Sequence, residues 1–371
     1  MSLLYLHIPY CKRICSYCDF YRTAALQSLP ATLVRMREEM LRRRDFLVDR
    51  HIRTVYFGGG TPSLVAPEEL QRLVDMADTL WDCGRLEEVT VEANPDDVTR
   101  DYVAALRRTA VDRVSLGIQS FDDGVLRLMN RRHSAAEAAD AVKRLQDAGY
   151  ENMSIDLIFG IDGFGGRVLD DSLQRAIELG VTHISAYHLT IEPRTLFARR
   201  VAEGKMREVD EQTSEREFRR VHEVLTGAGY EHYEVSNYAL PGCRARHNSA
   251  YWTGEAYIGI GPGAHSFDGD RLRCRCSSTA EEYSQGRTEY QSETLSTGEQ
   301  FDEYVMVSLR RAEGIDIDYV ERRFGGGHAE KMLAAARRWQ QSGDLVAEDG
   351  RLRIPPERFL ISDAVIESLF E

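Results

Sequence analysis

The chain of 371 residues predicts an α/β fold: a partial, TIM-like (β/α)6 barrel followed by a smaller helical, winged-helix-like C-terminal domain. Three observations predict it. Short apolar runs alternate with amphipathic helical stretches six times, polar residues gather where these runs end, and the alternation stops near residue 235. Repeated strand–helix units indicate parallel strands joined by helical crossovers. The repeat alone fits a doubly wound sheet equally well. The polar residues at the strand ends are therefore needed to distinguish this sheet from a partial barrel.

Six apolar runs rich in β-branched residues carry the predicted strands. They are residues 3–8, 52–57, 88–92, 113–118, 153–159 and 183–189. Helical signals separate them: Pro67 suits a first helical turn, Ser134 and Glu137 form a capping box, and Gly149 is a stop signal. Helical periodicity also predicts helices around residues 33–47, 169–177 and 218–225.

The end of the alternation divides the chain into three parts. We expect the barrel over residues 1–235, a linker segment over 236–290 and a helical domain over 291–371. In the last part, Asp349-Gly350 is a hairpin turn signal between two short apolar runs. Helices around a short hairpin resemble a winged-helix module. We expect it to pack against the barrel or bind a partner, with DNA recognition as the alternative.

Composition excludes several classes of protein. A hydrophobic fraction of 43% suits a large core and excludes intrinsic disorder. With 47 Lys and Arg against 60 Asp and Glu, the formal charge is −13, which argues against general nucleic-acid binding and against docking on anionic membranes. No apolar run has the length of a membrane-spanning segment, and the N-terminus has no secretory signal pattern. We therefore expect a cytoplasmic protein.

Three of the seven cysteines lie within eight residues, in the order Cys11, Cys15 and Cys18, directly after the first predicted strand. This C-x3-C-x2-C spacing can present three thiolates to one soft metal centre. Structural zinc is the simpler interpretation, but it requires a fourth ligand, for which only His7 or Asp19 is near in sequence. A [4Fe-4S] cluster held by three cysteines instead keeps one iron open for the amine and carboxylate of a small molecule.

The remaining cysteines have no spacing that completes a metal site. They are Cys83, Cys243, Cys274 and Cys276. An odd total in a reducing compartment argues against a disulfide framework. The pair Cys274-Arg275-Cys276 could bind metal, but we expect its two thiols on alternating sides of a strand, where they would not converge.

Polar groups follow or occupy the carboxyl ends of successive strands. Residues 58–61, Gly-Gly-Gly-Thr, allow a ligand to approach backbone N–H groups, with an ordinary strand-to-helix turn as the alternative. Glu92, Gln119 and Asp156 belong to the next three strands, and His188 ends the sixth. Buried carboxylates are costly unless they are paired or used. Because the carboxyl ends of barrel strands form one rim, these residues favour the barrel, with the cysteine loop and His188 facing the same cavity.

Together these motifs resemble the coproporphyrinogen dehydrogenase group of the radical S-adenosylmethionine (SAM) superfamily. The resemblance rests on residues 4–11, 58–62, 92–95, 115–120 and 233–239. It implies [4Fe-4S] ligation by Cys11, Cys15 and Cys18, with SAM on the open iron, where the superfamily forms a 5′-deoxyadenosyl radical. It also implies SAM contacts from Tyr5, Tyr17, Gly59, Gly60, Thr61, Glu92, Gln119, Arg131 and Asp156.

Three departures separate the chain from the oxygen-independent coproporphyrinogen III oxidases of this group. Phe20 stands in place of their fourth cysteine, the first strand begins at residue 3 without their long extension, and residues 247–252 fit the H-N-x-x-Y-W signature of the HemW haem-chaperone branch. The resemblance therefore implies a protein that holds haem and delivers it to acceptor proteins, with an electron donor for its cluster. Coproporphyrinogen III oxidation and a zinc-binding, non-catalytic module are the alternatives, and whether SAM is cleaved is left open.

The H-N-x-x-Y-W segment supplies the expected haem contacts. The resemblance implies that the imidazole of His247 ligates iron while Tyr251 and Trp252 offer flat apolar surface to the porphyrin. The alternative is that this segment only ties the linker to the barrel. Haem also carries two propionates, which need a local basic pocket on this acidic chain, and Arg244 and Arg246 are the nearest candidates in sequence.

Overall fold

The computed structural model describes residues 1–370. Within them, the dominant element is a mixed sheet of twelve strands, ordered β12-β11-β10-β9-β1-β2-β3-β4-β5-β6-β8-β7. The strand order runs from one edge to the other without closing, so the sheet is an open, partial barrel, as predicted. The central strands are parallel: β1 (Ser2–Ile8), β2 (Ile52–Gly59), β3 (Glu88–Ala93), β4 (Arg113–Gln119), β5 (Asn152–Phe159) and β6 (His183–His188).

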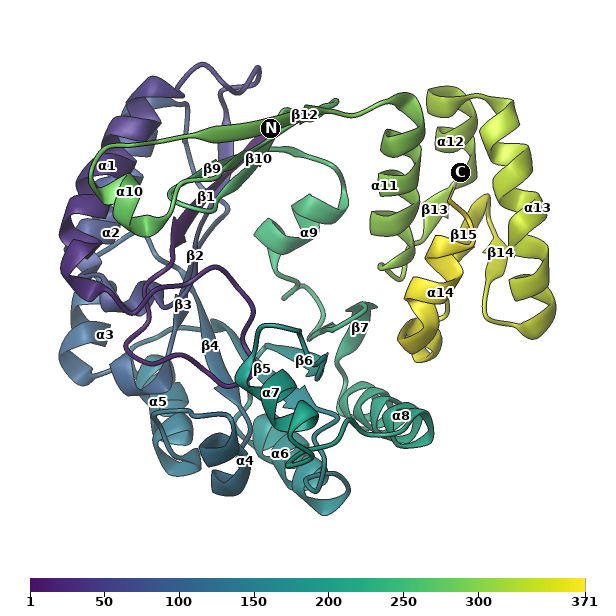
Figure 1. Ribbon diagram of the computed structural model, residues 1–371, viewed down its shortest axis with the longest axis horizontal. Coiled ribbons are helices and arrows are strands. Elements are labelled where there is room, and N and C mark those ends of the chain that lie inside the picture. The colour runs from purple at the N-terminus through teal and green to yellow at the C-terminus, as the bar shows by residue number, and fades with distance from the viewer. Residues whose placement is uncertain (371) are drawn as a thin grey trace.

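Helices connect the parallel strands and cover the outer face of the curved sheet (Figure 1). Pro67 opens the second helix, and Ser134 and Glu137 form the predicted reciprocal capping box of the fifth. Gly149 then adopts a left-handed φ of 84°, which ends that helix. These helices are α1 (Leu29–Arg42), α2 (Pro67–Leu80), α3 (Arg100–Leu106), α4 (Asp123–Leu128), α5 (Ala135–Asp147), α6 (Arg167–Glu178), α7 (Leu196–Ala202) and α8 (Glu211–Gly227).

Short strands within and beside the expected linker, residues 236–290, extend the sheet at both edges. On one side, β7 (Glu231–Glu234) and β8 (Asn237–Ala239) follow β6. On the other, β9 pairs in parallel with β1, and three antiparallel strands continue from it. Strands this short show too little alternation for recognition from sequence. The added elements are α9 (Arg246–Trp252), β9 (Ala256–Ile260), β10 (His265–Phe267), β11 (Leu272–Cys276), α10 (Ala280–Ser284) and β12 (Tyr290–Thr294).

The C-terminal unit combines helices with a small sheet ordered β13-β15-β14. Asp349 and Gly350 both have positive φ, 50° and 73°, and form the predicted hairpin turn. Backbone hydrogen bonds from Val235 to Arg310 and from Ala312 to Tyr233 attach this unit to β7. No helix within residues 1–370 is long and apolar enough to span a membrane. The elements are α11 (Thr297–Leu309), β13 (Ile315–Asp316), α12 (Ile317–Phe324), α13 (Gly326–Ser342), β14 (Val346–Glu348), β15 (Arg351–Arg353) and α14 (Ser362–Glu367).

A buried carboxylate on α1 fastens the added strands to the barrel. Glu39 is 0% exposed and accepts hydrogen bonds from the Tyr290 hydroxyl (2.6 Å), the Gly261 N–H (2.9 Å) and the Tyr283 hydroxyl. Arg43, one turn further along α1, lies 3.3 Å from the same carboxylate. A charge of this kind is stable inside a protein only when its oxygens are fully hydrogen-bonded, which this network achieves.

Cys274 and Cys276 lie on the buried face of β11, because residues two apart on a strand point the same way. Arg43 of α1 donates to the Cys274 sulfur at 3.1 Å. Both thiols therefore pack beneath the helices, away from the open face of the sheet.

Candidate functional site

The predicted site residues come from neighbouring strands at the same end of the parallel sheet. His7 of β1 lies opposite Gly58 of β2, Glu92 of β3 is level with Ser115 of β4, and Gly117 of β4 is level with Asp156 of β5. Parallel strands expose their carboxyl ends along one edge. The structure therefore brings the strand-end groups into one region.

Two of the three cysteines of the first loop accept hydrogen bonds from neighbouring side chains. The Thr61 hydroxyl donates to the Cys11 sulfur at 3.6 Å, and the Arg131 guanidinium donates to the Cys15 sulfur at 3.3 Å. Cys11 is buried, whereas Cys15 and Cys18 are half-buried. Burial raises the pKa of the Cys11 and Cys18 thiols, and the hydrogen bond from Thr61 opposes the rise at Cys11. The contact with Arg131 holds the Cys15 sulfur in place.

The predicted cluster would take three soft sulfur donors from one loop of this chain. Within residues 1–370, no three His, Cys, Asp or Glu side chains are gathered closely enough to hold one metal ion. A [4Fe-4S] cluster distributes three cysteine ligands over three different irons, whereas zinc gathers all its ligands around one centre. The donor set of three soft sulfurs on one loop is the set that an open-iron cluster requires.

The glycine run after β2 packs tightly against the cysteine loop. A Cβ atom on Gly60 would lie 2.7 Å from the Tyr10 carbonyl oxygen, and one on Gly59 would lie 2.8 Å from the His7 ring. Gly59 also has a φ of 117°, which favours glycine. Its N–H donates to the Glu92 carboxylate at 3.1 Å, so this donor is directed at a protein group. Close packing thus accounts for both glycines.

Two carboxylates with raised pKa values occupy the strand ends. Burial raises the pKa of Glu92 to about 7, against the lowering effect of the Tyr56 hydroxyl, which donates to it at 2.8 Å; nearby Asp156 adds to the rise. Burial also raises the pKa of Asp156 to about 6, opposed by its hydrogen bond with Ser185. Two partly desolvated carboxylates close together favour a ligand that carries positive charge or hydroxyl groups.

Arg131 links the ends of three elements. Its guanidinium donates to the Asn94 side-chain oxygen (2.6 Å) and to the Gly117 carbonyl, as well as to Cys15. Gln119 at the end of β4 has a φ of 75°, in the left-handed region that few non-glycine residues adopt, and the β4–β5 register shifts there. Such strain at a strand end is typical of a functional site.

The remaining predicted SAM contacts lie at two edges of this region. Tyr5 of β1 shares a hydrogen bond of 2.9 Å with the His7 ring. Tyr17 packs against Phe197 with ring centroids 6.4 Å apart. Asn94, which holds Arg131, is the site residue that the predicted contact set omits, although its polar side chain directly follows β3 in the sequence.

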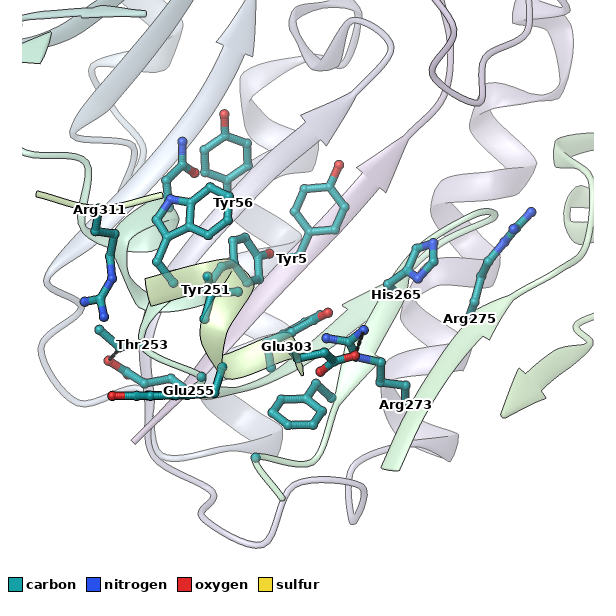
Figure 2. A pocket seen from close by; sticks show the side chains of 18 of the residues that line it. Tyr5, Tyr56, Tyr251, Thr253, Glu255, His265, Arg273, Arg275, Glu303 and Arg311 are labelled. Atoms are coloured by element: carbon teal, nitrogen blue, oxygen red, sulfur yellow. Dashed lines mark hydrogen bonds and ion pairs between the residues drawn. The ribbon is translucent and has the colours of Figure 1, made fainter. Parts of the chain in front are cut away.

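A cavity of about 1400 Å³ opens between this end of the sheet, α9 and the C-terminal unit (Figure 2). Tyr5, Gly59 and Glu92 line it from the barrel, and Tyr251 and Trp252 line it from α9. The residues predicted to contact SAM and those predicted to contact haem therefore open, in part, into the same space.

His247 lies behind the cavity wall. Its side chain is 0% exposed, and its two ring nitrogens face the Thr54 hydroxyl (2.7 Å) and the Tyr251 hydroxyl (2.9 Å). Burial lowers its pKa to about 3, so the ring is neutral. Both nitrogens are thus engaged, and this arrangement supports a structural role for His247 in place of iron ligation.

The expected basic pocket beside His247 is wrong. Arg244 pairs with Glu231 and Glu313, and Arg246 pairs with Glu87. The arginines that line the cavity come instead from elements that sequence reasoning did not place near it: Arg22, Arg194, Arg273, Arg275, Arg311, Arg323 and Arg351.

His188 also departs from expectation. Its ring contacts the Ser214 hydroxyl on α8 at 3.0 Å, whereas its neighbour Tyr187 lines the cavity. Adjacent strand residues point to opposite faces, so only one of the two can face inward. The prediction that His188 faces the cavity is wrong.

Comparison with known proteins identifies the family of this chain. Residues 5–176 match the model of the radical SAM superfamily. A Lactococcus lactis protein named "Heme chaperone HemW" is 34% identical over 86% of this chain and 84% of its own length. A Mycobacterium tuberculosis protein of the same name is 34% identical over 99% and 94%. The chain belongs to the HemW family.

This chain shares its fold with an enzyme of known structure. The structure of Escherichia coli coproporphyrinogen III oxidase matches with a TM-score of 0.84, covering 100% of this chain and 90% of that one, at 20% identity. Identity this low shows the common fold alone. The resemblance drawn from the motifs is thus confirmed for the family and for its radical SAM core.

Proposed function

We propose that this protein binds a [4Fe-4S] cluster, SAM and haem, and that it delivers haem to acceptor proteins. The observation that carries this proposal is the shared cavity, which is lined both by barrel residues such as Glu92 and by Tyr251 and Trp252 of α9. The chain's HemW relatives are named as haem chaperones. Cysteines that hold a cluster must stay reduced, so we place the protein in the cytoplasm, with an electron donor for the cluster.

In this proposal Cys11, Cys15 and Cys18 hold the cluster, which when bound supplies an electron to SAM. Arg131 fixes the position of the Cys15 sulfur relative to the ends of β3 and β4. Glu92 receives the charged or hydroxyl groups of SAM. The other SAM contacts follow the family motif: Tyr5, Tyr17, Gly59, Gly60, Thr61, Gln119 and Asp156.

The cavity has the size and the surface that a macrocycle requires. Its volume of about 1400 Å³ exceeds the range of roughly 300–1,000 Å³ typical of small-molecule sites. Tyr5 and Tyr56 stack with centroids 6.0 Å apart, and Tyr251 meets Tyr257 edge to face at 4.8 Å. Aromatic rings that line a cavity favour a flat, apolar ligand.

The direct test is a haem titration of the anaerobically reconstituted protein, with and without SAM, followed by transfer to an apo-haemoprotein. We expect stoichiometric haem binding and transfer. The same preparation is incubated with coproporphyrinogen III under reducing, anaerobic conditions. Phe20, which is 75% exposed and lines the cavity, stands where oxidases of this group carry a cysteine. Turnover of the porphyrinogen without haem transfer would replace this proposal with the catalytic alternative.

SAM affinity is expected to fall as the pH is lowered from 7.5 to 6. Glu92 must be ionised to bind a cationic ligand, and its pKa of about 7 leaves it mostly protonated at pH 6. Tyr56, Asp156 and Arg113 are the other titratable or charged groups around it, and Asp156 shifts the affinity in the same direction. We expect binding roughly three- to eightfold weaker at pH 6, measured by equilibrium dialysis at constant iron content. Equal affinity at both pH values would contradict this role.

Glu92→Gln is the matched control, because it keeps the shape of the side chain and removes its charge. We expect weak SAM binding at both pH values and a flatter pH dependence. A Glu92→Gln variant with the wild-type pH profile would assign the titration to another group.

His247→Ala is expected to weaken haem binding by less than about tenfold, which is the contribution of one ordinary hydrogen bond. The ligation state of the haem iron should not change. The substitution frees the Tyr251 hydroxyl and leaves the cluster intact. Tyr251→Phe, which removes the other half of the same hydrogen bond, should have a similar effect. Haem absorption spectra and dissociation constants measure both. Loss of the wild-type spectrum in His247→Ala alone would restore His247 as the iron ligand.

A further inference from the structure

Strands β10 and β11 present a cationic wall to the cavity. His265 lies directly opposite Arg275, and Phe267 lies opposite Arg273. Directly opposed residues, and residues two apart along a strand, share one face of a sheet. All four line the cavity, and Figure 2 shows His265, Arg273 and Arg275 extending from neighbouring strands. We refer to His265, Arg273 and Arg275 as the cationic wall.

Most other arginines of the cavity already have carboxylate partners. Arg194 pairs with Asp19, Arg323 with Asp270 and Arg351 with Asp316. The Arg22 guanidinium donates to the Phe20 carbonyl. The three paired arginines cannot bind an anionic ligand without first giving up a neutralising contact. Among the described residues Arg22 has no carboxylate partner, but it lies beside Cys11 and Cys18, and Arg311 is half-buried.

Arg275 differs from these arginines. It is exposed, and no carboxylate within residues 1–370 lies at ion-pair distance from it. Its cross-strand neighbour on β12 is the neutral Gln291. The facing His265 is also exposed. Partial desolvation of its ring, together with Arg275 and Arg273, lowers its pKa, whereas Glu293 raises it. In either protonation state the ring has an N–H to donate. The guanidinium and this imidazole are thus available to an anion.

Arg273 can bind an anionic ligand only if the ligand replaces its present carboxylate partner. Its guanidinium pairs with Glu303 of α11, in the C-terminal unit, and Glu293 is its cross-strand neighbour on β12. Burial raises the pKa of Glu303, so this carboxylate is held in a poorly solvated position. A ligand carboxylate has the same shape as that of Glu303 and can replace it on the guanidinium N–H donors of Arg273.

An aromatic surface adjoins the wall. The Arg273 guanidinium lies 5.6 Å from the Phe267 ring centroid, Tyr257 lies 6.3 Å from Phe267, and Tyr251 of α9 lies 4.8 Å from Tyr257. Arg273 and Arg275, two residues apart on one strand, are separated by about 7 Å along the strand axis. The combination suits a flat apolar body with two carboxylates on one edge.

We propose that the cationic wall binds the two propionates of haem, one at Arg275 and His265 and the other at Arg273, where it replaces Glu303. This inference rests on the proposed function and names the part of the cavity that receives the anionic edge of the cargo. Haem uptake then breaks the Arg273–Glu303 pair between β11 and α11.

The test compares haem with its dimethyl ester, in which both propionates are neutral, on the anaerobically reconstituted full chain. Wild type is expected to bind haem roughly ten- to a hundredfold more tightly than the ester. Arg275→Ala should lose about tenfold in haem affinity and nothing in ester affinity. Arg287→Ala is the matched control: this arginine is 63% exposed and pairs with Glu282 outside the cavity lining, so its haem affinity should equal that of wild type.

Glu303→Gln tests the exchange, because it frees Arg273 without removing the wall. We expect haem to bind several-fold more tightly and the cluster content to stay unchanged. Equal binding of haem and ester by wild type, or wild-type haem affinity in Arg275→Ala, would overturn the inference while leaving the haem-binding function in place. Wild-type protein that takes up neither ligand would overturn the proposed function itself.

Discussion

Replacing Cys15 with alanine is expected to abolish the [4Fe-4S] cluster. The substitution removes one of three thiolates on the loop after β1 and leaves the Arg131 guanidinium without its sulfur partner. The fourth iron of this [4Fe-4S] cluster has no protein ligand, so the cluster depends on all three cysteines and two cannot hold it. Iron and acid-labile sulfide, measured per chain after anaerobic reconstitution, should fall to background, and the visible absorption of the cluster should disappear.

Cys243→Ala is the control for this experiment. Cys243 is a free, half-buried thiol whose hydrogen bond to the Pro241 carbonyl is long, at 3.9 Å. Its removal should leave the iron and sulfide content at the wild-type level. A Cys15→Ala protein that keeps its full complement of iron and sulfide would contradict the ligand assignment, and zinc without iron in wild type would favour the non-catalytic alternative.

Glu39→Ala is expected to lower the free energy of unfolding by about 3–5 kcal/mol, the range for breaking a buried, hydrogen-bonded charge network. The change leaves Arg43 and three donors, from Tyr283, Tyr290 and Gly261, without their common acceptor. Urea denaturation of the cluster-free protein, followed by circular dichroism, measures the loss.

The adjacent Glu38 offers a matched control on the same helix. Its side chain is 42% exposed and pairs with Arg35 one turn earlier. Exposed pairs of this kind contribute at most about 1 kcal/mol, so Glu38→Ala should shift the unfolding midpoint only slightly. Similar losses in the two variants would show that the α1 carboxylates act through helix stability, and not through the buried network.

The barrel was predictable from sequence because its signals are local and repeated. Strands such as residues 113–118 are buried on both faces and read as continuous apolar runs, and the capping box at Ser134 marks a helix start directly. The cysteine spacing and the strand-end carboxylates were visible for the same reason. Their convergence at one rim follows from parallel topology alone.

The features that sequence reasoning missed depend on contacts between distant segments. Strands β9 to β12 have only three to five residues each, too few for a periodic signal. His247 has the composition of an iron ligand, but its two hydrogen-bond partners come from β2 and from its own helix. The alternation of Arg273 and Arg275 with buried cysteines was the available sign of a strand with one polar face.

The position of β1 inside the sheet has a consequence for biosynthesis. This N-terminal strand pairs with β2 on one side and with β9 on the other, and β9 ends at residue 260. β1 therefore acquires its second neighbour only after β9, more than two hundred residues later in the sequence, has been translated. The cysteine loop that follows β1 therefore gains its final structural neighbours late in translation. We therefore expect cluster insertion to follow the pairing of β9 with β1.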